Sequence, residues 1–171
     1  FIVAEAGNNH EGSFNNAIKL INAASKAGAD AIKFQTFKAH LFLDKRHPKY
    51  EMYKSFELTE KEFEKLSIHS REKNIEFFST PLDIPSAIFL NNIQKKFKIA
   101  SGDINFYQLI SKVASFKKKL IISSGASQLF EIKDAVKVIK KVWKNVFSEK
   151  NLSILHCISE YPAELKNINL N

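Results

Sequence analysis

Six short apolar runs alternate with five amphipathic segments along the 171 residues, and polar groups follow nearly every run. Such alternation is typical of parallel strands joined by right-handed helical crossovers. Polar residues at successive strand ends are what a (β/α) barrel uses to build its active face. The sequence therefore predicts an α/β fold, a TIM-type (β/α)8 barrel that is present here as a fragment of about six β/α units.

The apolar runs predict strands that are short and largely buried. The first of them, Phe1–Ala4, is apolar throughout and is expected to be a buried strand. Pro81 is expected to end the third strand, because proline cannot donate to a strand ladder. We expect strands at about residues 1–4, 31–35, 76–79, 97–100, 120–123 and 152–156.

The segments between the strands show helical spacing of apolar residues and helix-boundary signals. Gly28 fits the end of the first helix, and Thr59 with Glu62 forms a capping box at the start of the second. The polar stretch Ala39–Glu57 exceeds a usual connection, which favours a functional loop. The predicted helices cover residues 15–26, 59–73, 84–92, 106–115 and 129–143.

A doubly wound sheet would give the same order of elements. The barrel is favoured because functional-looking residues end nearly every strand, whereas a doubly wound sheet gathers them at its switch point. The sequence also has no Gly-x-Gly-x-x-Gly loop. A barrel needs eight strands, and the polar tail Lys166–Asn171 does not close a domain. We therefore expect residues 1–171 to form one incomplete barrel domain that lacks its last two β/α units.

The composition bounds the function. The formal net charge is +8, which indicates either a solvated lysine-rich surface or a field that attracts an anionic substrate. Arginine is scarce and no basic stripe is interleaved with aromatics, which argues against nucleic-acid binding. The lone Cys157 excludes an internal disulfide and is consistent with a cytoplasmic location. No apolar run is long enough to cross a membrane.

The strand ends carry groups suited to a small anionic substrate. Lys98, Ser101 and Asp103 place a cation, a hydroxyl and an acid within six residues. Lys33 lies at another strand end and could converge with Lys98 on one phosphate or carboxylate. Neutral donors come from Thr80, Ser101 and Ser123, and candidate acids, bases or metal ligands are Glu5 and Asp103.

These assignments have alternatives. Any one of the lysines could be a surface charge, and Asp103 could simply cap the helix that begins near Phe106. His10 and His156 lack the spacing of a zinc motif, and we interpret both as structural, with His156 mostly buried. Cys157 has apolar neighbours, which favours an inert buried thiol.

Six strings of the sequence together resemble the sialic acid synthase family, the N-acetylneuraminate synthase-like enzymes. They follow the family's order and span almost the whole chain. The matching strings are Ala4–Gly12, Gly28–Thr36, Phe78–Pro81, Lys98–Asp103, Ser123–Gly125 and His156–Pro162.

The resemblance implies a barrel enzyme that condenses phosphoenolpyruvate with an open-chain N-acetylated amino sugar, forming a nonulosonic acid for surface glycans and releasing phosphate. By motif position, the resemblance assigns phosphoenolpyruvate binding to Lys33, Thr80, Lys98, Ser101 and Ser123. It assigns the sugar side to Glu5, Asp103, Ser159 and Tyr161, with Glu5 and Asp103 as the catalytic pair.

This sequence departs from the family pattern on the sugar side. Family members commonly carry glutamate where Asp103 stands, and often asparagine where Ser159 stands, which leaves the identity of the sugar open. The resemblance also implies a divalent metal, manganese or magnesium, with both histidine ligands beyond Asn171, so that no metal ligand lies in this chain. It further implies a C-terminal antifreeze-like domain and a homodimer.

Two alternatives to this function stay open. One is another phosphoenolpyruvate–sugar condensing barrel that acts on a phosphorylated sugar. The other is a barrel-like binding module without catalysis.

Overall fold

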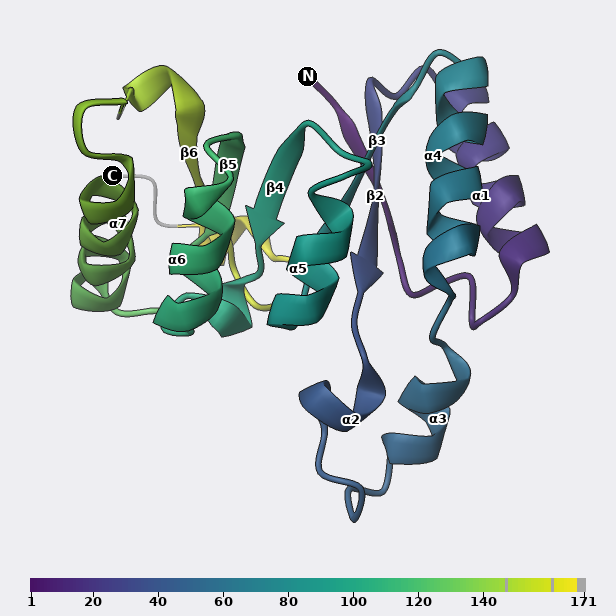
Figure 1. Ribbon diagram of the computed structural model, residues 1–171, viewed down its shortest axis with the longest axis horizontal. Coiled ribbons are helices and arrows are strands. Elements are labelled where there is room, and N and C mark those ends of the chain that lie inside the picture. Colours follow the sequence, from purple (N-terminus) through teal and green to yellow (C-terminus); the bar gives the residue numbers. More distant parts are fainter. Residues whose placement is uncertain (147, 161, 169–171) are drawn as a thin grey trace. The chain divides into compact units, whose positions relative to one another are not determined.

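The computed structural model describes residues 1–146, 148–160 and 162–168, which form two compact units, Phe1–Lys95 and Lys96–Asn171. Each unit is an α/β structure built on a parallel sheet, and each is described by itself (Figure 1). Among the described residues, no helix combines the length and the apolar character needed to cross a bilayer.

The first unit is a three-stranded parallel sheet in the order β1-β2-β3. Helices α1 and α4 pack against each other beside this sheet (Figure 1). The elements are β1 Val3–Gly7, α1 Phe14–Lys26, β2 Ala31–Thr36, α2 Ala39–Phe42, α3 Tyr50–Ser55, α4 Glu60–Glu72, β3 Glu76–Pro81 and α5 Ile84–Leu90.

The second unit repeats the plan with a parallel sheet in the order β4-β5-β6. Its helices α6 and α7 pack together, and the Trp143 indole N–H donates to the Ala114 carbonyl over 2.7 Å at their C-terminal ends. The elements are β4 Lys96–Ile99, α6 Tyr107–Ser115, β5 Lys119–Ser123, α7 Leu129–Trp143 and β6 Leu152–Leu155, with 3-10 turns at Ser101–Asp103, Lys144–Val146, Glu149–Asn151 and Leu165–Asn167.

The predicted elements are largely confirmed. The Thr59 side chain accepts from the Glu62 N–H while the Glu62 carboxylate accepts from the Thr59 N–H, which is the expected capping box. Gly28 follows α1 with φ of +79°, the left-handed conformation expected after a helix. Within each sheet the strands lie in chain order, as predicted. The structure adds α2 and α3, which lie in the stretch predicted as a loop.

The prediction of a buried first strand is wrong. Strand β1 runs from Val3 to Gly7, and the exposed fractions of Phe1, Ile2 and Val3 are 77%, 68% and 36%. Strand β1 is an edge strand of its sheet, with only β2 beside it, so its apolar start has no second neighbour among the described residues. An apolar run shows that burial is favourable, but it does not specify which element provides it.

The six strands form two sheets of three, whereas one set of six was expected. In the first sheet, the Gln94 side chain occupies the outer edge of β3. The Ser79 N–H donates to the Gln94 side-chain oxygen over 2.7 Å, and the Gln94 amide donates back to the Ser79 carbonyl over 3.1 Å. Both backbone groups of a strand residue point to the same edge. This buried amide thus satisfies β3 at that point in the way a neighbouring strand would.

Side-chain alternation separates a helix-facing side of β2 from a polar side. Phe34 stacks on Phe77 with ring centroids 5.7 Å apart and meets Phe63 of α4 edge-on at 6.5 Å. Lys33 and Gln35 point to the opposite face, since successive side chains of a strand alternate. The aromatic core on one face therefore fixes the polar pair on the other.

The connection between β2 and α4 is held to the rest of the first unit by close contacts. Buried Asp83 accepts from the Lys38 N–H and from Ser86 at the start of α5. Gly12 lies so close to the end of α3 that a Cβ on it would sit 2.0 Å from the Ser55 carbonyl oxygen. Since Gly12 also has a positive φ of +76°, glycine is required there for two separate reasons.

These two requirements can be separated by a matched pair of variants. Gly28 shares the positive φ, at +79°, but a Cβ there would meet nothing within 4 Å. We expect Gly28→Ala to cost about 1–2 kcal/mol of unfolding free energy from the left-handed backbone alone. Gly12→Ala should cost about 1–3 kcal/mol more, because the Ser55 carbonyl must move. Equal losses in denaturant unfolding of the two variants would contradict this close packing.

Candidate functional site

A buried cation lies at the centre of the polar face in the first unit. The Lys33 ammonium is 2.6 Å from a Glu5 carboxylate oxygen and 3.4 Å from the Thr80 hydroxyl. The Lys33 side chain is only 7% exposed, whereas the Glu5 side chain is 50% exposed. The structure thus brings together three of the residues selected from the sequence, on three different strands.

Strand register explains this grouping. In the parallel ladders Glu5 pairs with Lys33, and Lys33 pairs with Phe78. The side chains of Glu5, Lys33 and Phe78 therefore lie on one face of the sheet. Thr80 lies two residues after Phe78 and therefore falls on the same face. Lys33 lies in the middle of β2, whereas Glu5 and Thr80 lie within their strands because β1 and β3 extend three and two residues beyond their predicted ends. The ammonium is consequently held on rigid backbone.

Two amides at the same end of the sheet, those of Asn8 and Gln35, were not predicted as a pair from the sequence. The Asn8 side-chain amide donates to the Gln35 side-chain oxygen over 2.7 Å. The Asn8 side-chain oxygen is buried and has no hydrogen-bond partner among the described residues. The position of Gln35 in the sequence could have indicated this pair, because Gln35 lies two residues after Lys33 and therefore on the same face of β2.

In the second unit, hydroxyls gather around the turn after β5. The Gly125 N–H donates to the Ser101 hydroxyl over 3.1 Å. A Cβ on Gly125 would lie 2.9 Å from the Ser101 Oγ and 3.0 Å from the Ser159 Oγ. A side chain at position 125 would crowd both hydroxyls, so glycine lets Ser101 and Ser159 come close to this turn.

The remaining hydroxyl predictions have separate outcomes. Ser123, the last residue of β5, is buried, and its hydroxyl has no hydrogen-bond partner among the described residues. Tyr161, predicted on the sugar side, lies outside the described residues. The convergence of Lys33 with Lys98 stays a prediction.

Asp103 is a half-buried acid with a raised pKa. Burial raises the pKa of its carboxyl from 3.8 to about 6, while the nearby Lys98 cation acts to lower it. The alternative role as a helix cap is contradicted, since α6 begins after Phe106 without a side-chain cap. Asp103 instead ends the short 3-10 turn Ser101–Asp103. A carboxyl that titrates near neutral pH is suited to proton transfer.

The two histidines behave differently. His10 is buried as a structural group, with its Nδ1 accepting from the Gly12 N–H over 3.1 Å, and burial lowers the pKa of its imidazole. His156 was predicted to be mostly buried, and this is wrong: it is exposed, and its Nε2 lies 2.5 Å from the Ile168 carbonyl. Cys157 is likewise only half-buried. Both residues follow β6, the edge strand of its sheet, whose apolar side chains are partly exposed.

The described residues offer no cluster of three histidine, cysteine, aspartate or glutamate side chains arranged to hold a metal ion. The Glu5 carboxylate is engaged by Lys33, which is the wrong neighbour for a cation ligand. The described residues therefore do not fit a resident divalent metal.

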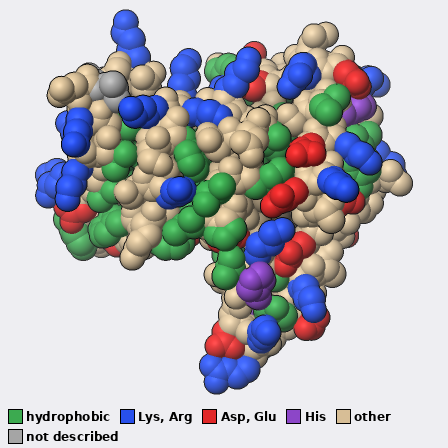
Figure 2. Space-filling model, in the orientation of Figure 1, with side chains coloured by type: hydrophobic (Ala, Val, Ile, Leu, Met, Phe, Trp, Pro, Cys, Tyr) green, Lys and Arg blue, Asp and Glu red, His purple; other side chains and the backbone are tan. Residues whose placement is uncertain are grey.

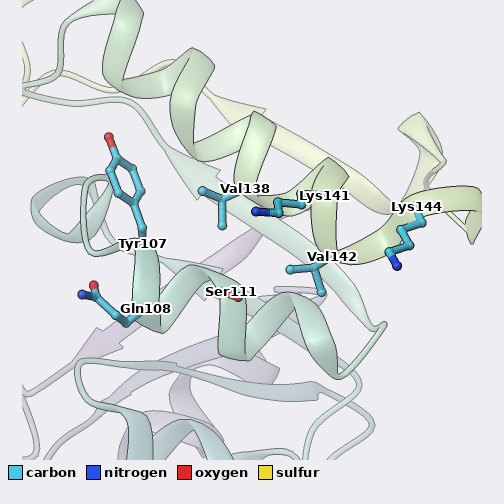
Figure 3. A pocket seen from close by; sticks show the side chains of 7 residues that line it. All are labelled: Tyr107, Gln108, Ser111, Val138, Lys141, Val142 and Lys144. Atoms are coloured by element: carbon cyan, nitrogen blue, oxygen red, sulfur yellow. The ribbon is translucent and has the colours of Figure 1, made fainter.

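Away from the strand ends, the surface carries mixed charges (Figure 2) and a hollow that contains none of the predicted site residues. Figure 2 shows lysine and arginine side chains spread over the visible face among acidic ones, which fits a solvated surface. A hollow of about 630 Å³ opens between α6 and α7, and none of its lining side chains is among the predicted site residues (Figure 3). They are Tyr107, Gln108, Ser111, Val138, Lys141, Val142 and Lys144.

The coupling between Lys98 and Asp103 is directly testable. Lys98→Met keeps the bulk of the side chain and removes the charge that opposes the raised pKa of Asp103. We expect that pKa to rise above its value of about 6, measured by carbon-13 NMR of the carboxyl group during a pH titration. Lys119→Met, at the start of β5, makes the same change in net charge and should leave Asp103 unmoved. An unchanged Asp103 titration in Lys98→Met would contradict the coupling.

Comparison with known proteins assigns this arrangement to a family. The chain is 43% identical to an uncharacterised protein of Methanocaldococcus jannaschii, over 100% of the chain and 50% of that protein. It is 39% identical to N,N'-diacetyllegionaminic acid synthase of Campylobacter jejuni, over 99% of the chain and 54% of the enzyme. The chain thus spans about half the length of the curated relatives that it matches.

Comparison with solved structures gives a similarity to the same kind of protein. The crystal structure of N-acetylneuraminic acid synthetase from Leptospira borgpetersenii, in complex with citrate, superimposes with a TM-score of 0.90 at 36% identity. The match covers 99% of this chain and 57% of that one. The profile of the NeuB family matches residues 20–171. The chain therefore belongs to the NeuB family.

Proposed function

We propose that the protein containing this chain condenses phosphoenolpyruvate with an N-acetylated amino sugar, forming a nonulosonic acid and releasing phosphate. The observation that carries this proposal is the buried Lys33 ammonium, held on a rigid strand beside the Thr80 hydroxyl. A buried cation of this kind is suited to an anionic substrate. Family membership supplies the class of reaction.

We assign phosphoenolpyruvate to the cation and hydroxyl groups, and the sugar to the carboxylates. Gly125 adds its N–H to this assignment, since it already contacts Ser101. The residues proposed for phosphoenolpyruvate are Lys33, Thr80, Lys98, Ser101 and Ser123, and those proposed for the sugar are Glu5, Asp103, Ser159 and Tyr161.

The proposed reaction joins carbon 3 of phosphoenolpyruvate to the aldehyde carbon of the sugar. Water adds at carbon 2, and the carbon–oxygen bond to phosphate breaks. The aldehyde oxygen gains one proton, and the water oxygen, which becomes the ketone oxygen of the product, loses two, the second of which leaves with phosphate, so the site needs a group that gives or takes protons near neutral pH. Asp103, with a pKa of about 6, meets this need, while Lys33 and Lys98 fix the anion.

Further parts of the proposal concern the whole protein. We propose that each unit is part of one (β/α)8 barrel and that a C-terminal domain follows. The exposed apolar residues on β1 and β6, such as Val3 and Ile154, support this, because both lie on edge strands that further strands could cover. A divalent metal would polarise the sugar aldehyde, and we expect its ligands outside residues 1–171. We also propose a cytoplasmic homodimer.

The reaction is tested with the full-length protein, phosphoenolpyruvate, Mn²⁺ and a panel of sugars, with phosphate release as the measurement. The identity to the Campylobacter jejuni synthase favours including diacetylated amino sugars beside singly acetylated ones. Turnover only with phosphorylated sugars would replace the proposal by the alternative condensing enzyme. Binding without turnover for every sugar would favour the non-catalytic module.

The phosphoenolpyruvate assignment predicts the kinetics of two lysine variants. Lys33→Met and Lys98→Met should each raise KM for phosphoenolpyruvate by about tenfold or more, since a hydrogen bond to a charged group contributes about 1.5–3 kcal/mol. Lys119→Met, which is exposed, controls for net charge and should keep the wild-type KM. Unchanged KM in both site variants would reject the assignment.

The proton-transfer role predicts the behaviour of Asp103→Asn. We expect turnover to fall by about 10²–10⁴, with phosphoenolpyruvate affinity nearly unchanged. Because the carboxyl pKa is raised from 3.8 to about 6 in the folded protein, its ionisation costs stability as pH rises through that window. The variant should therefore be at least as stable as wild type at pH 7, with the difference vanishing below pH ~4. Near-wild-type turnover at saturating sugar would reject the role.

A further inference from the structure

We propose that Glu5 serves as the internal counterion of Lys33, and that an anionic substrate must displace its carboxylate in order to bind. This inference rests on the proposed function for the identity of the anion, and it adds a competing group within the site itself. The affinity for the anion is then set by an exchange of partners on one ammonium.

Lys33 always needs an anionic partner. Its side chain is 93% buried, by difference from an exposed fraction of 7%. An unpaired ammonium at such a position is strongly unfavourable, by several kcal/mol. The Thr80 hydroxyl, 3.4 Å away, is neutral and cannot compensate the charge. Glu5, at 2.6 Å, provides the charge.

Lys33 and Glu5 are not equally free to move. Lys33 lies in the central strand β2, which is paired on both sides. Glu5 lies on the edge strand β1, and half of its side chain is exposed. Moving the carboxylate into water costs little, because water solvates it again, whereas moving the ammonium disrupts a central strand. Exchange therefore proceeds by departure of Glu5.

The backbone around Glu5 is irregular. The pairing of β1 with β2 shifts register between Glu5 and Gly7, so the ladder is irregular immediately after the carboxylate. Gly7 has a positive φ of +52°, and a Cβ there would lie 3.3 Å from a Glu5 carboxylate oxygen. The absence of a side chain at Gly7 leaves room beside the carboxylate on the side where the ladder is broken.

The inference predicts an unusual result: removal of a charged site residue strengthens binding. Calorimetric titration of the full-length protein with phosphoenolpyruvate should give a dissociation constant at least about tenfold lower for Glu5→Gln than for wild type. Inorganic phosphate serves as a second titrant and should show the same direction. Glu11→Gln, an exposed carboxylate in the loop after β1, makes the same change in net charge and should alter affinity less than twofold.

A double-mutant cycle assigns the gain to the pair. In a Lys33→Met background, Glu5→Gln should give no gain beyond that of Glu11→Gln, because no ammonium remains to be released. Thermal unfolding provides a readout if Glu5→Gln is destabilised. Its melting temperature should start lower than that of wild type and rise more steeply with added phosphoenolpyruvate.

The outcomes separate the two proposals. Unchanged or weaker anion binding in Glu5→Gln, together with an unchanged melting response, would overturn the inference even if the wild-type protein condenses phosphoenolpyruvate with a sugar. Tighter phosphate binding in Glu5→Gln would support the inference even if no sugar is turned over. A gain that persists in the Lys33→Met background would also overturn it.

Discussion

A buried lysine ammonium must keep an anionic partner, and this constraint organises the first unit. Lys33 can be buried on the central strand β2 because the parallel register places Glu5 directly beside it. The aromatic packing of Phe34 on the opposite face locks the strand that carries it. Without the carboxylate the ammonium would be unpaired in a low-dielectric environment, which is among the costliest arrangements in a protein. The electrostatics of the site and the packing of the sheet therefore depend on each other.

The polar groups that gather in the second unit are of a different kind. Its hydroxyls gather around the Gly125 N–H, and Asp103 is the acid whose pKa burial raises to about 6. One unit therefore presents a buried cation with its counterion, and the other presents neutral donors with a carboxyl that titrates near neutral pH. The condensation that we propose would use both kinds of group, since it binds an anion and moves protons.

Side chains also replace backbone where a parallel sheet ends. The Gln94 amide pairs with both backbone groups of Ser79, and Asp83 joins the start of α5 to Lys38 after β2. Buried strand edges need such partners, because an unpaired N–H or carbonyl away from water costs as much as a lost hydrogen bond. The Gln94 amide thus takes the place of a neighbouring strand beside Ser79, one residue before Thr80, on the edge of β3 that pairs with no strand among the described residues.

The sequence by itself determined the elements and their order, because caps and periodicity act over a few residues: the Thr59 capping box and the left-handed Gly28 are local. Its motifs also determined the family and most candidate residues. Only the tertiary structure decided which groups meet. The Asn8–Gln35 bond spans 27 positions and the Lys33–Thr80 contact spans 47, and both depend on strand register, which periodicity does not specify. The exposure of Phe1 and His156 and the partial burial of Asp103 were decided in the same way, since burial depends on which elements pack around a residue.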